Sequence, residues 1–118
     1  MSVGRPVDFA HLSRYTGGDA GLNAEVLTLF ASQTAVLLAR LDAALAARDT
    51  KVWRDTAHGL KGGARGIGAF ALADIAAAAE AFDPAASLED AANSLQQLKH
   101  QAEMVRLFVD AYLGHQEQ

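Results

Sequence analysis

"AHGLKGGARGIGA" (57–69) carries five glycines in thirteen residues, although its apolar residues recur at the spacing of an α-helix. Each glycine inside a helix costs about 0.8 to 1 kcal/mol relative to alanine. On a helix that turns about 100° per residue, five apolar residues fall within a band about 80° wide and form a stripe that would face a core. Its members are Trp53, Ala57, Leu60, Ala64 and Ile67. The stretch therefore predicts an amphipathic helix whose outward face is unusually bare.

Helical patterns also surround this stretch. Asp8 is placed to cap the first helix, Asp49 or Thr50 to cap the third, and Pro84 to stop the fourth. Alanine and leucine dominate, and no alternating run of β-branched residues predicts a strand. The sequence thus predicts an all-α fold, an antiparallel four-helix bundle with a short extra N-terminal helix. The predicted helices span about 6–16, 19–47, 50–66, 69–82 and 88–113, and 114–118 is expected to be a flexible tail.

Length and composition narrow the class of protein. The 118 residues suit one domain spanning 1–118, and the absence of cysteine excludes disulfides and thiolate metal sites. A net charge of -4 argues against general nucleic-acid binding. No uninterrupted apolar run approaches a membrane span, and the first residues do not resemble a signal peptide. We therefore expect a cytoplasmic monomer, and Met1 with the short ends favours a free-standing protein.

The outward face of the 57–69 helix combines a histidine with two unlike strips. His58 lies between a basic strip (Arg54, Lys61 and Arg65) and a nearly bare strip, which consists of Asp55 and the glycine strip (Gly59, Gly62 and Gly66). A neutral imidazole nitrogen can attack an electrophile without a general base, whereas a serine hydroxyl needs activation. Gly62 leaves space one turn beyond the ring, and Lys61 supplies a cation at i+3. A nucleophile, open space and a nearby cation suit an incoming phosphoryl group.

Gln33 is the candidate for orienting the ring. It is the one polar interruption on the expected inward stripe of the 19–47 helix, and a buried amide must find a hydrogen bond. The other members of that stripe are Val26, Phe30, Leu37, Leu41 and Ala44. We expect Gln33 to reach the His58 imidazole, directly or through water. The alternative, in which Gln33 lies at the edge of the bundle with its amide in water, is about equally favoured. Arg54 and Arg65 also suit simple solvated charges, and Gly59 and Gly63 suit close helix packing.

Other motifs fail on their context. "GIGAFA" (66–71) matches a dinucleotide-binding fingerprint, but no strand precedes it. "LKGG" (60–63) has glycine where a phosphate-binding loop needs serine or threonine after lysine. The four histidines lack the spacing of metal ligands. We therefore expect neither a metal nor a cofactor on this chain.

The longer stretch "AHGLKGGARGIGAFALADIAAAAE" (57–80) resembles the signature of histidine-containing phosphotransfer (HPt) domains. That signature reads A-H-x-L-K-G, a few small residues, an apolar residue, G-A-x-x-L, and a helix that ends in glutamate. The residues in matching positions are His58, Leu60, Lys61, Gly62, Ile67, Gly68, Ala69, Leu72 and Glu80.

This resemblance implies a four-helix bundle whose exposed histidine exchanges a phosphoryl group with aspartates of receiver domains. It makes His58 the phosphoacceptor, at Nε2, while Lys61 offsets phosphoryl charge and Gly62 gives clearance. Gln33 is a weaker match, at about the position where many members place a glutamine facing the histidine. Gly63 departs from the serine or alanine common there, so the resemblance implies no side-chain hydrogen bond to the phosphoryl group from that position, and it leaves the transfer itself unaffected.

Pattern and resemblance together favour a phosphorelay intermediate without kinase activity of its own. Its expected partners are response-regulator receiver domains, which would carry the Mg²⁺, and a hybrid histidine kinase. The main alternative is a non-catalytic helical adaptor that binds receivers. A histidine kinase dimerisation domain is less favoured, because it needs an adjoining ATP-binding domain for which the chain has no residues.

Overall fold

The computed structural model describes residues 5–116 and confirms the all-helical prediction for that part of the chain. The last helix continues past its predicted end at Leu113, so residues 114–116 are helical rather than a tail, while 117–118 lie outside the described residues. The five helices are α1 (Phe9–Thr16), α2 (Ala20–Ala47), α3 (Thr50–Ile67), α4 (Phe70–Glu80) and α5 (Leu88–Gln116).

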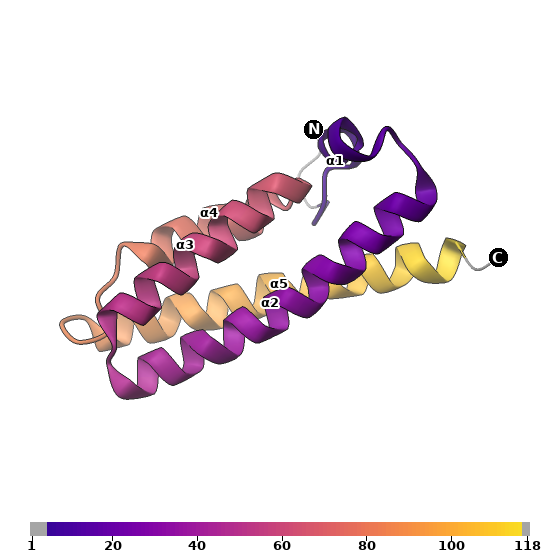
Figure 1. Ribbon diagram of the computed structural model, residues 1–118. Helices are drawn as coiled ribbons and strands as arrows, with labels where there is room; N and C mark the ends of the chain where they lie inside the picture. Colours follow the sequence, from indigo (N-terminus) through magenta and orange to yellow (C-terminus); the bar gives the residue numbers. More distant parts are fainter. Residues whose placement is uncertain (1–4, 117–118) are drawn as a thin grey trace.

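Four of these helices form a closed ring. Consecutive helices from α2 to α5 run in opposite directions, and α1 lies across one end (Figure 1). Helix α3 packs against α2 and α4, and α5 packs against the same two helices. Each member of the ring therefore has two neighbours, and α3 and α5 occupy opposite corners.

Local side-chain chemistry sets where α1, α2 and α3 begin. The carboxylates of Asp8, Asp19 and Asp49 each accept a hydrogen bond from a backbone N–H two or three residues further on. Such a cap satisfies one of the N–H groups that have no partner within the helix. Asp49, rather than Thr50, caps α3.

Helix α3 ends at Gly68, where the chain needs a conformation that only glycine adopts easily. The φ of Gly68 is 85°, and a Cβ there would lie 2.7 Å from the backbone oxygen of Asp8. The two residues are also joined by a hydrogen bond from Asp8 N to Gly68 O, 2.9 Å long. This close approach fastens the start of α1 to the turn between α3 and α4.

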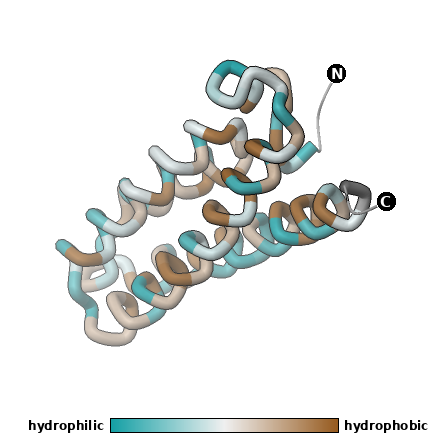
Figure 2. Tube along the Cα trace, turned by 45° about the vertical axis from the view of Figure 1, so that its right-hand side comes forward, coloured by the Kyte–Doolittle hydropathy of each residue, from teal (hydrophilic) through white to brown (hydrophobic). Residues whose placement is uncertain are grey.

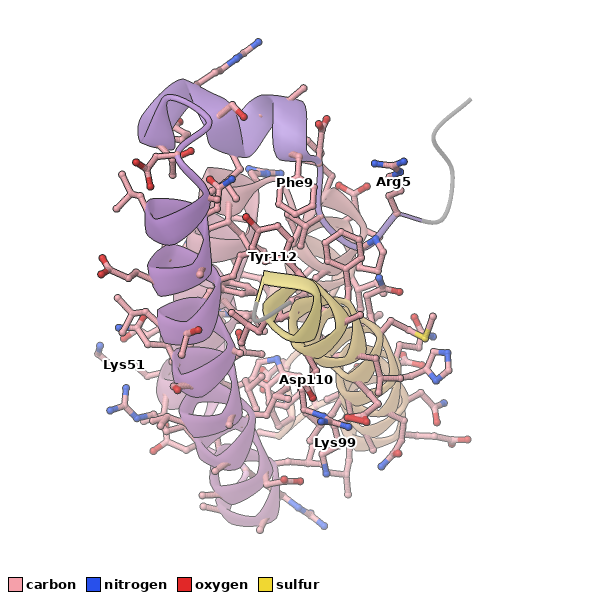
Figure 3. The ribbon with its side chains drawn as sticks, turned by 90° about the vertical axis from the view of Figure 1, so that its right-hand side faces the viewer. Arg5, Phe9, Lys51, Lys99, Asp110 and Tyr112 are labelled. Atoms are coloured by element: carbon pink, nitrogen blue, oxygen red, sulfur yellow. The ribbon has the colours of Figure 1, made fainter. Side chains whose placement is uncertain are left out.

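Aromatic packing holds α1 against the end of α5. The ring of Phe9 lies 5.5 Å from Phe108 and 5.0 Å from Tyr112, centroid to centroid. Figure 3 views the long helices end-on and shows Phe9 and Tyr112 at this end.

The inward face of α2 differs from the expected stripe. Phe30, Leu41 and Ala44 are buried as predicted, and Leu27 and Thr34 are also buried, whereas Gln33 is exposed. Apolar residues lie on most sides of α2, so their spacing does not decide which of two adjacent residues points into the core. The expectation that Gln33 faces the core is therefore wrong.

The same apolar character makes α2 the one described helix that could cross a membrane by length and composition alone. Charged residues at positions 25, 40 and 42 interrupt it, so the expectation that no uninterrupted apolar run reaches that length holds. Apolar positions recur along most of its length (Figure 2). A core helix passes the same test, and α2 packs here against α3 and α5.

Candidate functional site

His58 stands on the outer face of α3 with its two ring nitrogens in different surroundings. Its side chain is 68% exposed, and Nδ1 lies 3.1 Å from Oε2 of Glu80 on α4. An ionised carboxylate only accepts hydrogen bonds, so in the neutral imidazole this contact places the ring proton on Nδ1. Nε2 forms no hydrogen bond with any described residue. Its lone pair is therefore free and open to the outside.

Glu80 also binds Lys61. The ammonium Nζ donates to Oε1 of Glu80 over 2.7 Å, while Oε2 takes the imidazole. The Lys61 hydrogen bond, assisted by that of His58 and opposed by partial burial, holds the pKa of Glu80 below its ordinary value. Glu80 is thus a carboxylate at neutral pH, and it joins the two residues predicted to act on a phosphoryl group.

The backbone explains how one carboxylate reaches both partners. His58 and Lys61 are three residues apart on α3 and therefore project from neighbouring positions on its surface. Glu80 is the last residue of α4, the helix that packs most extensively against α3. The sequence matched Glu80 to a family signature but assigned it no role. Its place at the end of the alanine run 76–79 was the available signal.

Gln33 does not form the predicted hydrogen bond. Its side chain is exposed on α2, and no hydrogen bond joins it to His58. The ring partner is Glu80 instead, because α4 rather than α2 borders the Nδ1 side of the imidazole.

The glycine strip is open space rather than packed interface. A Cβ added at Gly59, Gly62 or Gly66 would meet no atom within 4 Å. At Gly63 it would lie 3.7 Å from Cε1 of Phe30, an ordinary van der Waals distance. Close helix packing therefore does not require glycine at these positions, and the packing alternative for Gly59 is wrong.

The basic strip divides into two parts. Lys61 is only 20% exposed in its side chain and turns toward α4. Arg54 and Arg65 are exposed, and neither forms an ion pair with another described residue. The face around His58 therefore carries two exposed guanidinium groups in a chain whose net charge is -4.

Acidic and histidine side chains do not converge elsewhere on the described surface. Between residues 5 and 116, no group of three or more could hold a metal ion.

Comparisons with known proteins agree with this site. The family model of the Hpt domain matches residues 25–108, which include His58, Lys61, Gly62 and Glu80. The crystal structure of histidine-containing phosphotransfer protein B (HptB) from Pseudomonas aeruginosa PAO1 superposes with a TM-score of 0.82 at 27% sequence identity. The match covers 93% of this chain and 96% of that one. No curated protein matches the sequence. With most of its length matched by that model, the chain belongs to the Hpt domain family.

Proposed function

We propose that the protein carries phosphoryl groups between receiver domains, with Nε2 of His58 as the acceptor. Nε2 attacks the phosphorus of a receiver's aspartyl phosphate, the N–P bond forms, and the aspartate leaves as a carboxylate. In the second half, the aspartate of another receiver attacks the same phosphorus and the imidazole leaves. The phosphoryl group is transferred twice, from aspartate to histidine and then from histidine to aspartate. Neither step needs an oxidant or a further co-reactant.

The free and outward-facing Nε2 is the observation that carries this proposal. In the neutral imidazole, the contact with Glu80 favours the proton on Nδ1 and leaves the lone pair of Nε2 available for attack. When the N–P bond forms, the ring becomes cationic, and the same carboxylate stabilises the positive charge at Nδ1–H. Lys61 lies beside the ring on Glu80 and can offset phosphoryl charge from there.

The surface beside His58 suits a large partner. The glycine strip lets a receiver bring its aspartate close to the ring, because no side chain projects from it. On α2, Leu22, Leu29 and Val36 are 40%, 61% and 52% exposed, and their seven-residue spacing places them on one face. Phe30, which follows Leu29 on α2, would lie 3.7 Å from a Cβ at Gly63, so α2 runs beside the glycine-bearing stretch of α3. We infer that the receiver covers both, burying apolar surface on one side of His58.

The remaining parts of the proposal concern the whole protein. The four-helix ring is an antiparallel four-helix bundle, and residues 1–118 make one domain that acts as a cytoplasmic monomer. The chain itself uses no cofactor, and the Mg²⁺ of the reaction belongs to the receiver. The HptB name and the family match support transfer as such; the donor, the recipient and a hybrid kinase partner are part of the proposal.

The test is incubation with phosphorylated candidate receivers, followed by detection of acid-labile, base-stable phosphate. The parent is expected to take up phosphate, and His58→Gln is expected to fold normally and take up none. Label that persists in the variant, or that maps to His11 or His100, would refute the assignment of His58. Receiver binding by the parent without phosphate uptake would instead favour the adaptor.

A further inference from the structure

Helix α4 buries mostly small side chains, which do little to fix its position against α3. Its buried residues are Leu72, Ala73, Ala76 and Ala79, of which three are alanines. Helices pack by fitting ridges of side chains into grooves, and single methyl groups make shallow ridges. Yet Glu80 at the end of this helix has to reach two partners on α3 at 3.1 Å and 2.7 Å.

One buried hydrogen bond joins the two helices just before Glu80. The indole Nε1 of Trp53, the only tryptophan of the chain, donates to the backbone oxygen of Ala79 over 2.8 Å. Trp53 is fully buried. Because α4 ends at Glu80, the Ala79 carbonyl has no N–H four residues on within the helix. It accepts from the backbone N–H of Phe82 over 3.1 Å, and its second lone pair is available to the indole.

We propose that Trp53 is a positioning residue for the phosphotransfer site, and that its indole N–H holds Glu80 in register with His58 and Lys61. The indole is rigid and belongs to α3, the helix that carries both of those residues. Its hydrogen bond to Ala79, the residue before Glu80, fixes the last turn of α4 both along the helix axis and around it. A buried N–H that loses its acceptor is costly, so the indole resists sliding of α4 in either direction.

This inference rests on the proposed function for its purpose but not for its test, since the position of Glu80 can be read without phosphate. The measurement is the fraction of His58 protonated at Nδ1, from the ¹⁵N chemical shifts of the neutral ring in the unphosphorylated protein. Trp53→Phe removes the donor and keeps an aromatic ring. We expect the Nδ1-protonated fraction to fall, and phosphate transfer to slow on the order of ten- to a hundredfold.

A double-mutant cycle separates positioning from general loosening of the core. Glu80→Ala alone is expected to lower the Nδ1-protonated fraction, and Trp53→Phe is expected to add nothing in that background. Leu98→Ala, in the buried face of α5, is the control for a core cavity and is expected to leave the fraction unchanged. If Trp53→Phe does not fold, the benzothiophene analogue of tryptophan at position 53 preserves the shape and lacks the N–H.

An unchanged Nδ1-protonated fraction in a folded Trp53 variant overturns the proposal, and so does an equal change with and without Glu80. Failure of the proposed function has a different signature: a parent that takes up no phosphate, whatever the ring tautomer.

Discussion

Substitution of Gly62 tests whether the bare face of α3 exists for a partner. Gly62 has helical φ and open space at its Cβ, so alanine there meets no clash. Gly62→Ala should therefore gain the full difference in helix propensity, about 0.8 to 1 kcal/mol. With an unfolding entropy of about 2.1 cal/mol/K per residue, a chain of 118 residues should gain about 4 °C in Tm.

Gly62→Gln separates stability from docking. Glutamine is also a good helix former, so the variant should unfold at or above the parental temperature. Its side chain would project beside the imidazole, where the receiver has to approach. Because a misplacement of about 1 Å can cost about 100-fold in rate, we expect transfer to slow by about that factor.

Thermal melts and single-turnover transfer rates measured on the same samples provide the assay. Gly68→Ala is the matched control, since φ of 85° and the 2.7 Å approach to Asp8 make that glycine structural. It should lower the free energy of unfolding by more than about 1 kcal/mol. A Gly62→Gln protein that melts below the parent would show that the strip is packed, and one that transfers at the parental rate would show that no partner covers it.

Two further predictions concern charge. Lys61→Ala should keep the fold and slow transfer on the order of ten- to a thousandfold in a single-turnover assay, because the ammonium acts on the transferring group; transfer at the parental rate would remove lysine from the mechanism. The Thr50 hydroxyl, and after it the Ala85 N–H, hold the pKa of Asp83 below its ordinary 3.8. The stabilisation by Asp83 is therefore complete above that pH and is lost as pH falls through the lower folded pKa. The Tm gap between the parent and Asp83→Ala, followed from pH 7 to pH 2, should narrow at the acid end; a constant gap contradicts this.

Local chemistry made much of the fold predictable. Asp8 and Asp49 cap helices through bonds to residues two or three positions on, so their effect is written in adjacent sequence. The outward face of His58 followed from the apolar stripe of its own helix, which is interrupted by glycine and charge and so has one clear direction.

The ring partner could not be derived in the same way, because it depends on how two helices pack. Gln33 and Thr34 are both polar in a helix that is apolar on nearly every side, so periodicity could not decide which one faces inward. Glu80 reaches His58 across 22 positions of sequence, and the bond from Trp53 to Ala79 that accompanies it spans 26. Neither contact leaves a trace in the spacing of residues along one helix.

The openness of His58 has a consequence for timing. A phosphoryl group on Nε2 would be as accessible to water as to a receiver, since no described side chain covers that nitrogen and the residue is 68% exposed. The fold then adds no barrier against hydrolysis, and the intrinsic lability of the N–P bond sets how long the signal lasts. The time available for delivery is then a property of the N–P bond, while the rate of encounter depends on the surface around it. Arg54 and Arg65, which form no ion pair with another described residue, would speed that encounter when the partner is acidic.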